Sequence, residues 1–279
     1  MWTIEKPIMG ALDTFDTCRA GITNVGLRGR LLAARPLIGA AEAAFDAAAV
    51  AGTDHLIKTA THVGEVTSGE MERLYTRHMA RGKSRGRDIY DELMMAATND
   101  MCPFCGHRSV STLDHTLPKA LHPALAVTPI NLVPCCKDCN HGKGTVSPTE
   151  AAEQWLNAYY DDISADRWLY AEVVEGAPPA AVFFVDPPDT WDGVTASRVQ
   201  NQFERLDLAK LYASQAARQF QNTRRALREI HESAGHEGVQ EDLNRRYLSC
   251  TEVMVNSWEA ALYQAASVSN WYCDGGFAL

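Results

Sequence analysis

The sequence lacks any apolar run that approaches the ~20 residues of a membrane-spanning helix. Its N-terminal segment, MWTIEKPIMG, also lacks the basic start and apolar core of a secretory signal peptide. We therefore expect a cytoplasmic protein with no membrane partner. Positive charge is not in excess either, because 35 acidic residues outnumber 26 Lys and Arg and give a net charge of -9. Any nucleic acid must then be bound through a local basic patch or with the help of a partner.

The chain is long enough and apolar enough to fold as a globular protein. Its 279 residues can bury one large core or two smaller ones. A composition of 46% hydrophobic and 22% charged residues excludes a disordered or fibrous class. Eight cysteines in a chain expected to be cytoplasmic favour metal ligation over disulfide bonds, because the cytosol keeps thiols reduced.

Helix-forming patterns dominate the sequence, and we expect a mainly α fold with a small α+β insert. An Ala- and Leu-rich stretch at 27–51 predicts a helix that is broken or kinked near Pro36. Thr67 and Glu70 stand at capping-box spacing and predict the start of a second helix. The amphipathic stretch 88–98 predicts a third helix.

After residue 146 the sequence predicts further helices and one β-hairpin. Ser147 is placed to cap a helix that continues through 151–163. Two β-prone runs, 168–175 and 180–185, are separated by a Gly- and Pro-rich turn and predict a hairpin. The remaining residues have helical periodicity with a break at Gly235. The predicted domains are a helical N-terminal region (1–99), a small central module (100–146) and a mostly helical C-terminal region with the hairpin (147–279).

A run of cations precedes the central module. Six Lys and Arg side chains fall between Arg73 and Arg87, and no Asp or Glu lies among them. Such a run either contacts the phosphates of a nucleic acid or forms a solvated helix face and loop, and the sequence leaves both interpretations open. The candidate nucleic-acid contacts in this run are Arg81, Lys83, Arg85 and Arg87.

Two Cys-x-x-Cys pairs frame the central module. Each pair forms a turn that presents two thiolates to one ion, and four thiolates at tetrahedral angles saturate a structural zinc. A saturated site of this kind holds a small fold together but performs no chemistry. Cys135 would give a Cys-x-x-x-Cys spacing, and we interpret it as a buried apolar side chain or a neighbour of the site. The predicted zinc ligands are Cys102, Cys105, Cys136 and Cys139.

A second group of polar residues lies between and directly after the cysteine pairs. Asp114 and His115 follow a short β-prone stretch, Asn131 precedes another, and Asn140 comes directly after the last cysteine of the pairs. The ordered pattern is Cys-x-x-Cys, Asp-His, a nearby proline, Asn-Leu-x-Pro-x-Cys-x-x-Cys-Asn and a trailing lysine. Over residues 100–145 this pattern resembles the HNH endonuclease family.

The resemblance implies a central ββα-metal HNH module between helical N- and C-terminal regions. It assigns to His115 the role of general base that activates water, to Asp114 the binding of a catalytic Mg2+ or Mn2+, and to Asn131 the orientation of His115 or its loop. Asn140 takes the third family position and would ligate the cation through its amide oxygen. His141 is the alternative ligand, and a one-residue shift turns a helical side chain by about 100°. Candidate phosphate contacts within the module are Lys119 and Lys143.

The resemblance implies a metal-dependent endonuclease that hydrolyses phosphodiester bonds, with double-stranded DNA as the expected substrate. The acidic total and the long helical flanks favour a subunit of a complex, such as a bacterial defence or restriction-type assembly with an ATPase partner. A non-catalytic zinc-binding interaction module is an alternative, although a purely structural zinc site requires none of the second group of polar residues. An RNA-cleaving nuclease or toxin is another alternative, which the sequence does not separate from the first.

Overall fold

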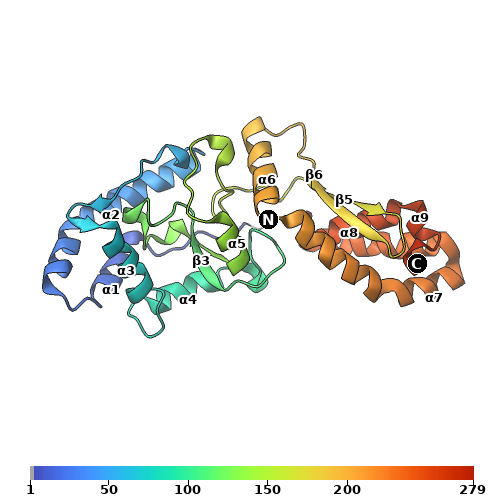
Figure 1. Ribbon diagram of the computed structural model, residues 1–279, viewed down its shortest axis with the longest axis horizontal. Coiled ribbons are helices and arrows are strands. Elements are labelled where there is room, and N and C mark those ends of the chain that lie inside the picture. Colours follow the sequence, from blue (N-terminus) through green and yellow to red (C-terminus); the bar gives the residue numbers. More distant parts are fainter. Residues whose placement is uncertain (1–2) are drawn as a thin grey trace. The chain divides into compact units, whose positions relative to one another are not determined.

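The computed structural model describes residues 3–279, which divide into two compact units (Figure 1). The N-terminal unit contains residues 3–162 and the C-terminal unit contains residues 163–279. The predicted boundaries at 99/100 and 146/147 both lie inside the N-terminal unit. The fold is mainly helical with small antiparallel sheets, as predicted. Within the described range, no helix combines the length and the apolar character needed to cross a membrane.

The N-terminal unit combines helices with two small β-hairpins. Its helices are α1 (Ala11–Arg19), α2 (Val25–Val50), α3 (Ser68–His78), α4 (Arg87–Met95) and α5 (Lys137–Lys143). Its strands are β1 (His62–Val63), β2 (Val66–Thr67), β3 (Thr112–His115) and β4 (Leu132–Cys135). Short 3-10 turns connect them, among them η3 (Pro123–Leu125), η4 (Pro129–Asn131) and η5 (Ala151–Glu153). The pair β1–β2 was not predicted from the sequence, because a strand of two residues is too short to show an alternating pattern.

The pair β3–β4 confirms the short strands predicted in the central module. The strands are antiparallel, with Leu113 opposite Pro134 and His115 opposite Leu132. Proline has no N–H to donate to a neighbouring strand. Pro134 is tolerated because each strand of a two-stranded sheet has an open edge, where a missing N–H breaks no hydrogen bond between strands. β4 runs directly into α5, and Cys136 is the residue that caps this helix. His115 thus stands at the end of β3, close to the start of the loop that leads to η3.

The helices of the N-terminal unit and the β3–β4 pair belong to one hydrophobic core. Leu31 of α2 and Met71 and Leu74 of α3 pack in the same buried cluster as Leu113 and Leu132 of the two strands. Full burial of such a side chain contributes about 1.5–3 kcal/mol of transfer free energy. This packing holds α3 beside the strand that carries Asp114 and His115.

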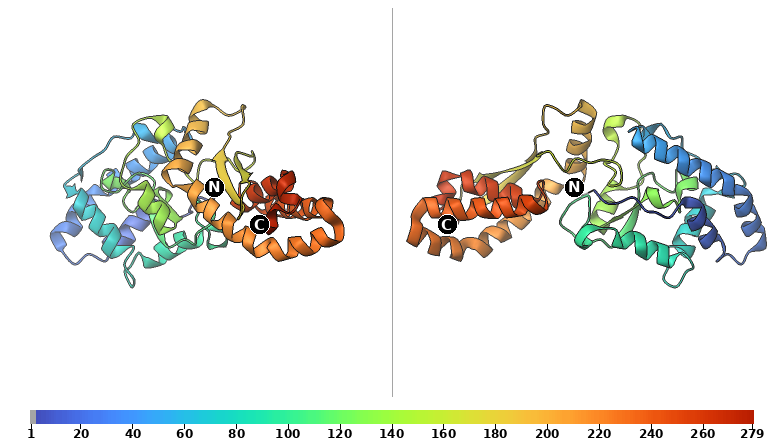
Figure 2. Two further views of the ribbon diagram at one scale, coloured as in Figure 1. Left: turned by 45° about the vertical axis from the view of Figure 1, so that its right-hand side comes forward. Right: turned by 180° about the vertical axis from the view of Figure 1, so that it is seen from behind.

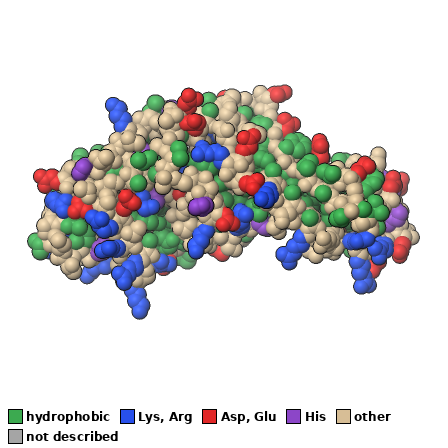
Figure 3. Space-filling view, in the orientation of Figure 1, with side chains coloured by type: hydrophobic (Ala, Val, Ile, Leu, Met, Phe, Trp, Pro, Cys, Tyr) green, Lys and Arg blue, Asp and Glu red, His purple; other side chains and the backbone are tan. Residues whose placement is uncertain are grey.

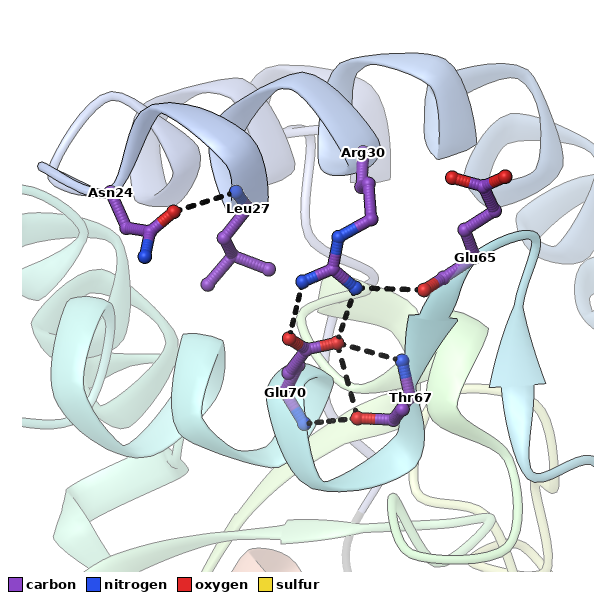
Figure 4. Close-up of polar contacts among 6 residues, drawn as sticks. All are labelled: Asn24, Leu27, Arg30, Glu65, Thr67 and Glu70. Carbon is purple, nitrogen blue, oxygen red and sulfur yellow. Dashed lines mark hydrogen bonds and ion pairs between the residues drawn. The ribbon is translucent and has the colours of Figure 1, made fainter.

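The start of α3 is fixed by the predicted capping box. The Thr67 hydroxyl accepts a hydrogen bond from Glu70 N (3.3 Å), and the Glu70 carboxylate accepts one from Thr67 N (3.0 Å). Arg30 of α2 donates to both carboxylate oxygens of Glu70, at 2.8 and 2.6 Å, and also to the Glu65 carbonyl (Figure 4). The hydrogen bond from Arg30 is the largest cause that lowers the pKa of Glu70, to about 2. The pair ties the start of α3 to α2.

We expect Glu70→Gln to destabilise the protein in a pH-dependent way. The pKa of Glu70 is depressed from 4.5 to about 2, so its stabilising contribution is present above pH 4.5 and is lost as the pH falls through about 2. The difference in unfolding free energy between wild type and Glu70→Gln should therefore shrink over this interval, as measured by urea denaturation at a series of pH values. In an Arg30→Gln background the same substitution should show a smaller pH effect. A difference that stays constant from pH 6 to pH 2 would contradict the role given to Arg30.

Of the break or kink predicted near Pro36, the break does not occur, because α2 runs through this residue as one helix. Proline cannot donate to the carbonyl four residues earlier, which is that of Leu32. Both Leu32 and Pro36 are exposed, so water can satisfy that carbonyl. Leu31, Ile38 and other residues on the opposite face of α2 are buried and hold the helix on the core.

The helix predicted through 151–163 is also wrong, since only the turn η5 forms there. The hydroxyl of Ser147, the predicted cap, is hydrogen-bonded to His122 Nε2 at 3.2 Å. The residues that follow, 154–159, are all buried, whereas a surface helix would expose one face. Their backbone groups form hydrogen bonds with distant residues instead of helical hydrogen bonds. The Ala158 carbonyl, for example, accepts one from Ile4 N (2.9 Å).

The C-terminal unit packs long helices against one β-hairpin, as predicted. The hairpin is β5 (Leu169–Val174) with β6 (Ala180–Val185), and the helices are α6 (Gly193–Arg205), α7 (Leu208–Val253), α8 (Trp258–Val268) and α9 (Asn270–Cys273). Gly235 has φ 63° and ψ -157°, which only glycine adopts without strain, and it divides α7 into two helical segments. The C-terminal unit contains this long element folded back on itself (Figure 2). The predicted break at Gly235 is confirmed. The Asn256 side chain accepts hydrogen bonds from Trp168 N and Leu169 N and fixes the start of β5.

Candidate metal centre and the adjoining cavity

The four cysteines of the two pairs meet in one buried cluster. Their sulfur atoms all lie within 4.8 Å of one another, and each residue is at most 3% exposed. Tetrahedral bonds of about 2.3 Å from each sulfur to a zinc ion place the sulfurs about 3.8 Å apart. The cluster is therefore close enough to bind one metal ion, and its all-sulfur donor set is compatible with zinc. The residues brought together are Cys102, Cys105, Cys136 and Cys139.

Backbone hydrogen bonds shape each cysteine pair into a metal-binding turn. In the first pair, Gly106 N donates to the Cys102 carbonyl (2.8 Å), and Arg108 N donates to Cys105 Sγ (3.4 Å). Gly106 has φ 57°, which lets the chain turn back under the sulfurs. In the second pair, Cys139 N donates to Cys136 Sγ (3.4 Å) at the start of α5. N–H groups directed at sulfur stabilise thiolates, the form that binds a metal.

The thiols also interact with one another. Hydrogen bonds from Cys102 and Cys139 help to lower the pKa of Cys136 to about 6, and those from Cys102, Cys136 and Cys139 lower the pKa of Cys105. The same network raises the pKa of Cys102 and of Cys139. Cys135 lies on β4 outside the cluster and is fully buried, and burial raises its pKa. The interpretation of Cys135 as a buried apolar side chain agrees with this position.

Asp114 and His115 lie at the end of β3 and are both buried, at 4% and 5% exposure. The Asp114 Oδ2 atom forms an ion pair with Lys143 Nζ of α5 at 2.9 Å. Burial raises the pKa of Asp114, and the charge of Lys143 opposes this shift. A carboxylate at the edge of a cavity can offer an oxygen to a cation, and Asp114 lines such a cavity.

His115 has its ring held in one orientation. Nε2 lies 2.9 Å from the Ala126 carbonyl, and the Tyr75 ring packs against the imidazole in a T-shaped arrangement with centroids 4.6 Å apart. A carbonyl only accepts, so Nε2 carries the hydrogen and Nδ1 keeps a free lone pair. Burial, followed by the positive charge of Lys119, lowers the pKa of His115 to about 3. The imidazole is consequently neutral near pH 7 and can accept a proton at Nδ1.

Asn131 fastens the loop that follows β3. Its side chain accepts a hydrogen bond from Leu117 N (2.8 Å) and donates to the carbonyls of Leu117 (3.0 Å) and Leu125 (3.2 Å). Leu117 is two residues beyond His115, and Leu125 precedes Ala126, whose carbonyl holds the imidazole. Asn131 is fully buried, so its amide acts on the loop and not on a substrate. This arrangement agrees with the predicted orienting role.

A cavity of about 110 Å³ lies beside the end of β3. Asp114, His115 and Asn140 all line it, whereas His141 is exposed and is not among its lining residues. The placement favours Asn140 over His141 as the amide or imidazole that faces Asp114. Glu72 of α3 also lines the cavity. The sequence did not predict its position at the cavity, because Glu72 belongs to no metal-binding or catalytic motif and lies some forty positions before the Asp-His pair.

The two lysines predicted to contact phosphate lie in different surroundings. Lys119 lines the cavity and lies over the Tyr75 ring, with Nζ 5.4 Å from its centroid. Lys143 is 3% exposed, and its ammonium donates to the His115 and Thr116 carbonyls at 2.5 and 3.0 Å. Lys143 therefore points into the module and clamps the end of β3, away from any phosphate at the surface.

The basic run begins on α3 with Arg73 and Arg77 and continues into the loop between α3 and α4. Arg81, Lys83 and Arg85 are exposed there, and blue side chains project from the loop at the lower left of Figure 3. Arg87 is instead bound to Asp91 at 2.6 Å and donates to the Ala80 carbonyl at 2.7 Å. Of the four residues predicted from this run, Arg87 thus serves α4, and the other three remain available to a partner.

A cavity in the C-terminal unit is larger, at about 200 Å³, but its chemistry is different. Its lining consists mainly of proline, alanine and phenylalanine side chains, with Arg224 as the charged residue among the described ones. It offers no carboxylate, imidazole or thiol for acid–base or metal chemistry. The smaller cavity at β3 combines a carboxylate, an imidazole and an amide, and we take it as the candidate functional site for that reason.

Comparison with known proteins relates the chain to a phage protein. No family model and no solved structure matches the chain. The chain is similar to protein ea31 of Escherichia phage lambda, with 31% identity over 237 residues. The match covers 80% of each of the two chains. The similarity therefore extends well beyond the short segment that contains the cysteine pairs.

Proposed function

The chain belongs to the family of protein ea31 of Escherichia phage lambda, and we propose that it is a metal-dependent endonuclease of the HNH type that hydrolyses phosphodiester bonds in DNA. One observation carries the proposal. Asp114 and His115 of β3 and Asn140 of α5 line one cavity, β4 pairs with β3 and leads into α5, and a separate cluster of four cysteines lies in the same segment. This order of two antiparallel strands and a helix is what a ββα-metal module requires. Zinc in the cysteine cluster would hold the module together.

His115 acts as the general base in this proposal. The attacking water gives a proton to Nδ1 of the neutral imidazole, and its oxygen forms a bond to phosphorus while the bond to the 3′-oxygen breaks. The Ala126 carbonyl fixes the tautomer, and Tyr75 and Asn131 prevent the ring and its loop from turning away. A phosphate brought to the cavity adds negative charge, which counteracts the effect of Lys119 and strengthens His115 as a base.

Asp114 and Asn140 supply oxygen ligands for a Mg2+ or Mn2+ ion. Carboxylate and amide oxygens suit these hard cations, and the side chains of Asp114 and Asn140 line the same cavity. When bound, the cation supplies charge stabilisation to the phosphate and to the leaving 3′-oxygen. The Lys143 ammonium contacts the Asp114 carboxylate and the His115 carbonyl and fixes their positions.

Incubation of the full-length protein with supercoiled plasmid tests this function. We expect nicked and linear DNA in the presence of Mg2+ or Mn2+ and none after chelation of the divalent cation. Cleavage of an RNA substrate with the plasmid left intact would favour the RNA-cleaving alternative. Failure to cut any nucleic acid in the presence of metal would favour the zinc-binding interaction module.

The exposed cations before α4 provide the contact with DNA phosphates in this proposal. Substitution of Arg81 and Arg85 by glutamine is expected to weaken DNA binding and to reduce the slope of log K against log salt by about 1 per lost phosphate contact. Titration of labelled duplex at several salt concentrations measures both quantities. The matched control replaces Arg28 and Lys58, two exposed cations elsewhere in the N-terminal unit. Equal losses in both variants would show that only net charge matters.

A partner protein remains part of the proposal. The net charge of -9 opposes unassisted binding to DNA, and the exposed basic loop is small. We therefore place the chain in a complex, of which a bacterial defence or restriction-type assembly with an ATPase subunit is an example. Co-purification from cells that express the neighbouring genes, followed by the plasmid assay, tests whether an added subunit raises the cleavage rate.

A further inference from the structure

The cavity beside β3 receives a wall from α3, which lies outside the segment that resembles HNH proteins. Glu72 and Tyr75 are three positions apart on this helix and therefore lie on the same face. Tyr75 packs against the His115 ring, so the face that carries Glu72 is turned toward the end of β3. Glu72 accordingly lines the same cavity as Asp114 and Asn140.

The charges around the cavity indicate that a divalent cation requires a second carboxylate ligand there. Lys119 lines the cavity, and the Lys143 ammonium lies 2.9 Å from Asp114 Oδ2. These two positive charges outweigh the single negative charge of Asp114, so a divalent cation would be repelled from a site built on Asp114 and Asn140 alone. Ionised Glu72 restores the balance before the cation enters. Mg2+ is commonly held by one or two carboxylates together with water and substrate phosphate.

The Glu72 carboxylate is available for this role. Its backbone carbonyl accepts a hydrogen bond from the Thr76 hydroxyl (2.9 Å), but among the described residues no ion pair or hydrogen bond involves its carboxylate. Glu70, two positions earlier, is fully engaged by Arg30 and Thr67. The two acids therefore differ in function although they lie on the same turn of α3.

We propose that Glu72 is the second carboxylate ligand of the divalent cation held by Asp114 and Asn140. The proposal rests on the proposed function, because it concerns the same cation. It makes α3 part of the metal site and explains why this helix shares a buried core with β3 and β4.

Mn2+ binding to the full-length, zinc-loaded protein tests the proposal without reference to cleavage. Calorimetric titration or Mn2+ electron paramagnetic resonance should show affinity at least about tenfold weaker in Glu72→Gln. Glu72→Asp keeps the charge and should bind Mn2+ more tightly than Glu72→Gln. Glu92→Gln removes an exposed acid from α4 and is the matched control, expected to bind like wild type. Circular dichroism and zinc content verify that each variant is folded.

The outcomes separate this proposal from the proposed function. Unchanged Mn2+ affinity in Glu72→Gln, together with loss of binding in Asp114→Asn, would overturn the role of Glu72 and leave the nuclease site standing. Equal weakening in Glu72→Gln and Glu92→Gln would overturn it as well, because net charge alone would then explain the effect. Absence of Mn2+ binding in the wild type would overturn both proposals.

Discussion

Replacement of His115 by alanine is expected to lower the rate of plasmid cleavage by about 10²–10⁴-fold, the usual contribution of a general base. No other described imidazole lines the cavity, so the proton of the attacking water has no alternative acceptor of this kind. Initial rates of nicking at a fixed Mn2+ concentration measure the effect. DNA binding should change little, since His115 is buried and its role is confined to the chemical step.

Two controls give this prediction its specificity. His141→Ala should cleave like wild type, whereas Asn140→Ala should lose both Mn2+ affinity and activity. The reason is that, of these two neighbours, Asn140 lines the cavity and His141 does not. The reverse result would transfer the ligand role to His141. His115→Asn, which leaves a smaller void beside Tyr75 than alanine does, separates loss of the base from loss of packing. Undiminished cleavage by folded His115→Ala and His115→Asn proteins would exclude His115 as the base.

Removal of the metal from the cysteine cluster should abolish the fold of the β3–β4–α5 segment. Zinc contributes about 10–16 kcal/mol to small zinc-dependent folds, which is as large as the whole stability of a typical domain, about 5–15 kcal/mol. We expect about one zinc per chain. Cys136→Ala should lose that zinc and, with it, the Mn2+ site. It should also unfold at a markedly lower temperature, because Cys136 caps α5 as well.

Cys135→Ala is the matched control for the zinc prediction. The two cysteines are neighbours in sequence and both are buried, but Cys135 lies outside the cluster of four sulfurs. Its substitution should keep the zinc and remove only a small buried thiol. Retention of zinc by Cys136→Ala, or an unchanged melting curve after its loss, would contradict a structural role for the metal.

Local signals in the sequence were sufficient for many elements of the fold. The capping box of Thr67 and Glu70 involves residues three positions apart, so its pattern is complete within one turn. The break at Gly235 depends on one residue that tolerates positive φ. The cysteine pairs likewise carry their own spacing, and the structure gathers all four sulfurs as predicted.

Features that depend on distant contacts were missed or misplaced. The segment 154–159 has a helical appearance in sequence, but its backbone is satisfied by remote partners such as Ile4 N. Lys143 was predicted to contact phosphate, yet its ammonium is buried at the end of β3, where it binds two carbonyls and the Asp114 carboxylate. Glu72 enters the site only because α3 packs on the strands. No spacing within one element contains such information.

Anomalous X-ray scattering from crystals grown with Mn2+ tests the central claim most directly, namely that one module holds two metal sites with different tasks. Data collected on either side of the zinc and manganese absorption edges distinguish the two elements. The predicted result is a zinc peak among Cys102, Cys105, Cys136 and Cys139 and a manganese peak between Asp114 and Asn140. Manganese that is absent from the cavity, or bound only at surface acids, would contradict the claim.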